Sequence, residues 1–250
     1  EQGHLDAQCN YGICCRDGTG VPQDDSEAGC LFRLVANKGH ADAQNALGLC
    51  FERGRQFFNI LLVDHDEAAR LFRRSAKQGD ATGQYNSARC YQDGQGERQD
   101  DREAARLYGQ AADQGLAAAH FDLAGFCKMG KCVPQDFVEA ARYCCLAANK
   151  GYAKAQSALA QAHEHGREIR QDFGEAASYY RLAADQGFAF AQFKYGFLYS
   201  SGRGGRRTEA ARYYRLTAEQ GLADAQHDLV ILFVVGRGVP ADMGKAARYF

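Results

Sequence analysis

Small, apolar and polar residues follow one another along this chain in a pattern that returns about every 36 residues. Each repeat opens with a glycine, followed by small residues and usually by an amide side chain, as in residues 39–44 and 151–156. The opening glycines lie 36, 40, 36, 36, 36 and 34 residues apart: Gly3, Gly39, Gly79, Gly115, Gly151, Gly187 and Gly221. Seven segments in one register indicate a repeat array rather than one or two globular domains.

Two helices are predicted within each repeat. Counting phase from the opening glycine as zero, small or apolar residues at phases 4, 8, 9 and 12, such as Ala43 and Phe51, share one face of a helix over phases 2–14. Phase 15 is always glycine, which suits a left-handed helix end. A second helix is expected to begin after an aspartate at phase 21 and to end at the next opening glycine. These N-cap aspartates are Asp24, Asp100, Asp136, Asp172 and Asp242.

Composition agrees with this architecture. The 250 residues include 28 glycines and 3 prolines, and half of the glycines fall at phases 0 and 15, while the prolines share phase 19. Collagen, disordered and coiled-coil classes are excluded, because 46% of the residues are hydrophobic and the glycines mark turns rather than filling the chain. The pattern therefore predicts an all-α solenoid in which each repeat packs only on its neighbours.

The repeat motif resembles that of the Sel-one-like repeat family, relatives of the tetratricopeptide repeats. Residues 18–24 (GTGVPQD) and 176–187 (AASYYRLAADQG) match the family pattern closely, and the resemblance covers essentially the whole chain. It implies a right-handed α/α superhelical solenoid of seven helix-turn-helix repeats and a role as a scaffold or adaptor. Three repeats depart from the pattern: the second is four residues longer, the sixth is two shorter, and the third has Ser87-Ala88 where Leu-Gly is usual.

Charge and hydropathy bear on the kind of partner. Thirty Lys and Arg against 31 Asp and Glu give a net charge of −1, which does not favour nucleic acid or anionic lipid. The basic turn at residues 203–207 has no aromatic platform beside it, so we interpret it as a solvated turn. The longest apolar run, residues 229–235, is too short to span a bilayer. We expect a protein or peptide partner, no nucleic acid and no membrane span.

Ten cysteines raise the question of disulfides or metal. Cys14, Cys50 and Cys90 share phase 11 and five others are irregular, but equivalent positions in adjacent repeats lie roughly 10 Å apart, beyond disulfide reach. We therefore interpret the cysteines as small apolar residues in a reducing compartment. A metal site would use Cys127 and Cys132 with His163 or His165, but no second close pair completes four ligands. No cofactor is expected, and a cysteine-based metal- or haem-binding assembly factor stays an alternative.

Catalytic motifs are absent from the sequence. There is no Ser-x-x-Lys, Gly-x-Ser-x-Gly, His-Glu-x-x-His, P-loop or dinucleotide fingerprint. Carboxylates recur at phases 21 and 24, where helix capping explains them better than acid–base catalysis. We predict a non-enzymatic scaffold, with a hydrolase-like enzyme whose site lies in the groove as the alternative.

Two surfaces are candidates for partner binding. The first helices are expected to line the concave face, with phases 3, 7, 10 and 14 facing the groove. Those phases hold Arg53, Asn86, Arg89, Asp93, Asp122, Met129, Gln161, His165, Lys194 and Phe197. The long turn of the second repeat carries the other set, which either folds onto neighbouring helices or forms an exposed anchor: Phe57, Phe58, Ile60, Leu61 and Leu62.

Neither end resembles a polar capping repeat. Residues 1–3 look like the close of a preceding second helix, and residues 248–250 lie midway through one. We therefore expect residues 1–250 to form a single array that is a segment of a longer one, or an array whose end a partner covers.

Overall fold

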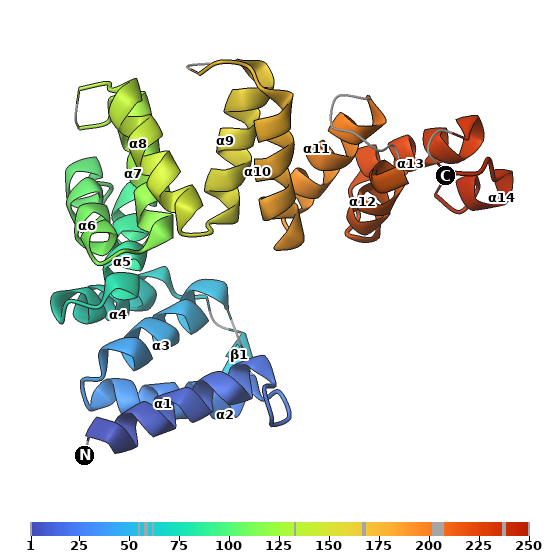
Figure 1. Cartoon of the computed structure of the whole chain (residues 1–250). Coiled ribbons are helices and arrows are strands. Elements are labelled where there is room, and N and C mark those ends of the chain that lie inside the picture. The colour runs from blue at the N-terminus through green and yellow to red at the C-terminus, as the bar shows by residue number, and fades with distance from the viewer. Residues whose placement is uncertain are drawn as a thin grey trace. The chain divides into compact units, whose positions relative to one another are not determined.

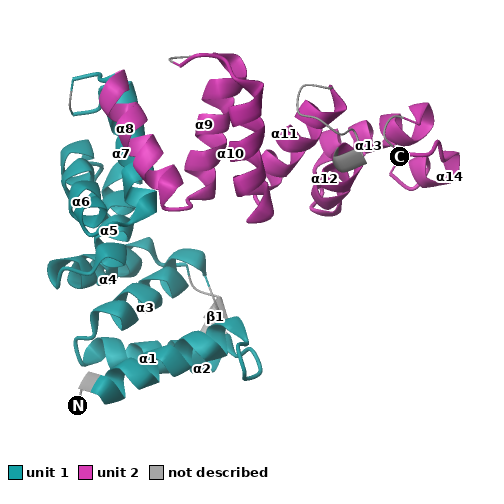
Figure 2. Ribbon diagram, viewed as in Figure 1, with its two compact units in different colours: residues 1–136 teal, residues 137–250 magenta. Residues whose placement is uncertain are grey.

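The computed structural model describes residues 2–54, 56–57, 60–61, 63–132, 134–166, 169–201, 208–236 and 239–249. The chain is built from antiparallel helices in helix-turn-helix repeats, which confirms the predicted all-α solenoid class (Figure 1). It divides into two compact units, residues 1–136 and residues 137–250 (Figure 2).

Unit 1 contains the first three repeats and the first helix of the fourth. Helices of 13 residues recur after the longer α1, and each starts within a residue or so of the position that the repeat phase predicts, except α4, which the insertion in the second repeat shifts along the chain. The elements are α1 (Gln2–Asp17), α2 (Asp25–Asn37), α3 (Ala41–Arg53), β1 (Gln56–Phe57), β2 (Ile60–Leu61), α4 (His65–Lys77), α5 (Ala81–Asp93), α6 (Asp101–Asp113) and α7 (Ala117–Met129).

Unit 2 continues the same alternation of first and second helices. Its elements are α8 (Phe137–Asn149), α9 (Ala153–His165), α10 (Phe173–Asp185), α11 (Ala189–Ser200), α12 (Thr208–Glu219), α13 (Ala223–Val235) and α14 (Met243–Ala246). The odd-numbered helices are the first helices of their repeats and the even-numbered ones are the second.

Helices begin and end at the aspartates and glycines that the repeat pattern predicts. The phase-15 glycines of six repeats have φ of 62–70°, the left-handed conformation in which a Cβ is strained. Asp24, Asp100, Asp172 and Asp242 each accept a backbone N–H from the first turn of the following helix. These bonds stabilise the ionised carboxyl and hold the pKa of Asp172 below its ordinary value. The insertion in the second repeat moves this cap to Asp64, which accepts from the N–H of Glu67.

The same aspartates join the two helices of a repeat. The backbone N–H of the capping aspartate donates to the phase-12 carbonyl of the preceding first helix, at 2.8–3.1 Å in six repeats. This bond occupies the N–H that a glutamate three residues later reaches in a capping box. In the second, third and fourth repeats the glutamate pairs instead with an arginine three residues further on, as Glu67 does with Arg70 and Glu103 with Arg106. One aspartate therefore starts the second helix and fixes its position against the first.

A buried aromatic ring at phase 29 is the largest element of the core in most repeats, where phases after the turn of the second and sixth repeats are corrected for their different lengths. Its members are Phe32, Phe72, Tyr108, Tyr180 and Tyr214, all at most 1% exposed. Glycine at phase 9 leaves room for the ring, because a Cβ on Gly48 would lie only 2.6 Å from Phe72. The usual Leu-Gly pair is thus explained by packing: leucine fills the interface and glycine admits the ring.

Glutamines connect successive repeats. In four repeats the phase-5 glutamine donates to a carbonyl near the end of the preceding second helix at 3.1–3.3 Å, as Gln44 does to Ala36. Its side-chain oxygen commonly accepts from a glutamine at the end of the next second helix, as Gln44 does from Gln78 at 2.8 Å. These buried bonds satisfy carbonyls at helix ends. The sequence showed the recurring amide without indicating its partners.

Candidate functional site

The first-helix face, defined as phases 3, 7, 10 and 14 of the odd-numbered helices, is only partly open to solvent. Of the ten side chains predicted there, five are exposed, four are half-buried and one is buried. The exposed ones are Arg53, Asp93, Met129, His165 and Phe197, and the half-buried ones are Arg89, Asp122, Gln161 and Lys194.

Asn86 is the exception, and its predicted place in a partner-binding surface is wrong. Its side chain is 5% exposed, and its amide nitrogen donates to the side-chain oxygen of Asn45, which is also buried, at 2.7 Å. Helices α3 and α5 approach closely enough for phase 7 of one repeat to meet phase 6 of the repeat before it. The residue therefore stabilises the stacking of two repeats and does not face a ligand.

Arg89 is held in place by a carboxylate of the preceding repeat. Its guanidinium lies 3.3 Å from Glu52, which is at phase 13 of α3. In other repeats a phase-13 side chain accepts from a phase-29 tyrosine, but the second repeat has Phe72 there, so Glu52 receives no such bond. Burial alone lowers the pKa of Arg89, and the charge of Glu52 and its neighbours outweighs this and raises the pKa. Arg89 thus remains a cation in a fixed orientation.

A buried carboxylate organises the corresponding part of unit 2. Glu164 on α9 is 6% exposed, accepts from the hydroxyl of Tyr180 at 2.7 Å and lies 3.0 Å from the ammonium of Lys194 on α11. Burial, and then the bond to Glu164, raises the pKa of Tyr180, so its hydroxyl stays a donor at neutral pH. The ammonium of Lys194 also lies 5.6 Å from the centre of the Phe197 ring.

Beside this cluster, exposed apolar side chains occupy the first-helix face of α11 and α13. Phe190 and Phe197 lie two helical turns apart on α11, at 41% and 39% exposure. On α13, Ile231 and Val235 are exposed, although the apolar run around them is otherwise largely buried. Only Phe197 of these four was a predicted site residue. Apolar residues at phase 3, 10 or 14 gave a partial signal for the others, but phase alone does not fix exposure, because Ile13 and Leu49 at phase 10 are half-buried against the core.

The long turn of the second repeat contains a short antiparallel ladder. Gln56 pairs with Leu61 and Phe57 with Ile60, and β1 lies next to α2 (Figure 1). The sequence had indicated a turn without a ladder. Phe58 and Leu62 lie outside the described residues, as do the side chains of Phe57, Ile60 and Leu61. Partner binding by this turn stays a prediction.

All ten cysteines lie in the described part of the chain, and none of them forms a disulfide. Burial is the main cause that raises the pKa of Cys9 to about 11 and of Cys90 to about 12, so both are protonated and unreactive near neutral pH. Within the part of the chain that the structure describes, no three His, Cys, Asp or Glu side chains gather as metal ligands. Among the same residues, no helix combines the length and the apolar character needed to cross a bilayer.

Comparison with known proteins points to one family. The Sel1 repeat profile matches seven consecutive segments: residues 5–40, 41–80, 81–116, 117–152, 153–188, 189–222 and 223–250. No curated protein matches the chain at a significant level.

Several solved structures share the fold. A protective antigen of uropathogenic Escherichia coli strains, described as having an SLR fold, is 30% identical with a TM-score of 0.71. That match covers all of this chain and 53% of the antigen, so the chain spans about half of that relative's length. A Sel1 repeat protein from Oxalobacter formigenes is 24% identical, with a TM-score of 0.79 and 96% of both chains covered. An immunity protein from Pseudomonas aeruginosa is 18% identical, with a TM-score of 0.56, covering 84% of this chain and 74% of that one.

Proposed function

The chain belongs to the Sel1 repeat family, and we propose that it is a non-enzymatic scaffold that binds a partner protein through the first-helix face of its repeats. Members of this family generally mediate protein–protein interactions and are generally non-catalytic. The observation that carries the proposal for this chain is the set of four exposed apolar side chains on the first-helix face of α11 and α13, namely Phe190, Phe197, Ile231 and Val235.

The arrangement of these side chains suits an apolar segment of a partner. Residues seven apart on a helix are separated by about 10.5 Å along its axis, so Phe190 and Phe197 offer two anchors in line. Aromatic side chains of this kind often contribute much of the binding energy at protein interfaces. The ion pair of Lys194 with Glu164 holds the ammonium close to Phe197, so the polar edge of the surface is already ordered before a partner arrives.

The test is photo-crosslinking in a native extract, with the crosslinking amino acid placed at position 197 or at position 182. Leu182 on α10 is exposed to a similar degree, 46%, but belongs to a second helix, so it is a matched control. We expect a discrete partner protein to crosslink at position 197, to disappear when Ile231→Ser is added, and not to crosslink at position 182. Equal crosslinking at both positions would contradict binding through the first-helix face.

A further inference from the structure

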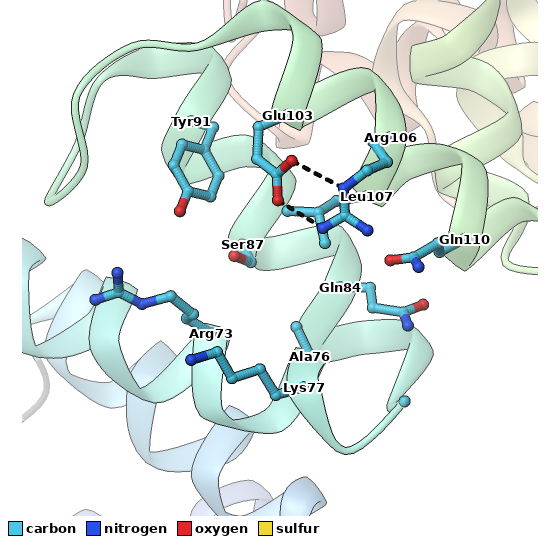
Figure 3. Close-up of a pocket in the computed structure, with 11 residues that line it drawn as sticks. Arg73, Ala76, Lys77, Gln84, Ser87, Tyr91, Glu103, Arg106, Leu107 and Gln110 are labelled. Carbon is cyan, nitrogen blue, oxygen red and sulfur yellow. Dashed lines mark hydrogen bonds and ion pairs between the residues drawn. The ribbon is translucent and has the colours of Figure 1, made fainter.

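An open pocket lies between α4, α5 and α6 of unit 1, away from the first-helix face. Its volume is about 480 Å³. Gln84, Ser87 and Leu107, all buried, form its floor, and the cations Arg73, Lys77 and Arg106 stand at its rim. Figure 3 shows Arg73 and Lys77 on one side of the opening and Arg106, bonded to Glu103, on the other.

Ser87 accounts for much of the space. It occupies phase 8, where the other six repeats carry leucine or tyrosine: Tyr11, Leu47, Leu123, Leu159, Tyr195 and Leu229. Ser87 is 2% exposed, so it lies in the interface and yet cannot fill it. In the third repeat a small serine stands where a larger side chain would pack, and the space that it leaves becomes the floor of the pocket.

Lys77 supplies the uncompensated positive charge at the rim of the pocket. The two arginines at the rim are compensated, because Arg73 lies 3.1 Å from Glu97 and Arg106 pairs through two bonds with Glu103. Lys77 has no ion-pair partner among the residues that the structure describes. In the other repeats that reach the position equivalent to Lys77, that position holds a neutral or an acidic residue: Asn37, Asp113, Asn149, Asp185 and Glu219.

Gln84 provides a hydrogen-bond donor at the floor. Its counterparts in four other repeats use the side-chain nitrogen to bond a carbonyl of the preceding second helix. At Gln84 that bond is absent from the described structure, while the side-chain oxygen still accepts from Gln114 at 2.8 Å. The oxygen is thus engaged in the stacking of repeats, and the NH₂ group is left to donate to a molecule in the pocket.

We propose that this pocket binds a carboxylate group. One uncompensated ammonium and one amide donor match a single negative charge with two acceptor oxygens. A phosphate dianion would need a second uncompensated cation, and both arginines are engaged. Leu107 provides apolar contact for the carbon chain that carries the carboxylate. The ligand is either a small carboxylic acid or an acidic side chain of a peptide, and this site is independent of the first-helix face.

The experiment is a titration of the full chain with glutarate, with a short acetylated peptide containing two glutamates, and with inorganic phosphate. Binding is followed by calorimetry and by the NMR signals of glutamine side-chain amides. We expect the carboxylates to bind with Kd on the order of 1 mM or tighter. The tighter of glutarate and peptide identifies the source, and either supports the proposal. Phosphate binding more tightly than both carboxylates, or no carboxylate binding, would overturn it.

Two variants test the site, and both introduce residues that other repeats already carry. Lys77→Asn takes the residue of Asn37 and Asn149, and Ser87→Leu takes that of Leu47. Each should weaken carboxylate binding by about tenfold or more, by loss of charge or of space. Lys150→Asn makes the same charge change on an exposed residue of unit 2 and should leave binding unchanged. Unchanged binding in both pocket variants, with normal circular dichroism spectra, would refute the site.

Discussion

Tyr108 and Tyr180 occupy the same phase in two repeats and differ mainly in the acceptor of their hydroxyl groups. Tyr108 donates to the neutral amide of Gln92 at 2.9 Å, and Tyr180 donates to the carboxylate of Glu164 at 2.7 Å. Both rings are at most 1% exposed. Because Phe72 fills this phase in the second repeat, a change of tyrosine to phenylalanine should keep the ring packing and remove only the hydroxyl group.

The cost of each change follows from the acceptor. A neutral hydrogen bond contributes about 0.5–1.5 kcal/mol to stability, and one to a charged group contributes about 1.5–3 kcal/mol. Tyr108→Phe should therefore destabilise its repeat by about 1 kcal/mol and Tyr180→Phe by about 2 kcal/mol. The difference arises because Glu164 is 6% exposed and, without the hydroxyl, retains among the described residues the ammonium of Lys194 alone to compensate its charge.

Amide hydrogen exchange measured by mass spectrometry is the suitable assay, since stacked repeats need not unfold together and exchange reports α6 and α10 separately. Tyr180→Phe should accelerate exchange in α10 more than Tyr108→Phe accelerates it in α6. Urea unfolding of the full chain gives a second measure. Equal losses, or a smaller loss at Tyr180, would show that the carboxylate adds nothing to the bond and would refute the reasoning.

Two further predictions concern buried groups in unit 1. Asn86→Ala leaves the buried amide of Asn45 without its partner and should cost about 1–3 kcal/mol in urea unfolding. The double change with Asn45→Ala should cost less than the sum of the single changes, and simple additivity would contradict the pairing. Iodoacetamide at about pH 8 should alkylate the exposed Cys30 and Cys145 well before Cys90, whose burial raises its pKa to about 12. Peptide mass spectrometry over time checks this order, and early labelling of Cys90 would count against it.

The candidate site was only partly predictable from sequence. The repeat phase predicted Phe197, Arg89 and Lys194 as partner-binding residues; the structure leaves Phe197 exposed and Arg89 and Lys194 half-buried, and partner binding by all three stays a prediction. It wrongly placed Asn86, because whether phase 7 faces solvent depends on how closely the next first helix approaches. It also gave no sign of Glu164, since a glutamate within a helix resembles any solvated one until its neighbours are known.

The sequence by itself determined the repeat register, the order of helices and their ends. These features are local: left-handed glycines, capping aspartates and a 3.6-residue apolar period act within one repeat, so they can be read along the chain. Only the tertiary structure decided which side chains of adjacent repeats meet. The pairing of Glu52 with Arg89, and the space above Ser87, depend on the distance and stagger between repeats. That stagger is the result of side-chain packing across the interface, which no single repeat specifies.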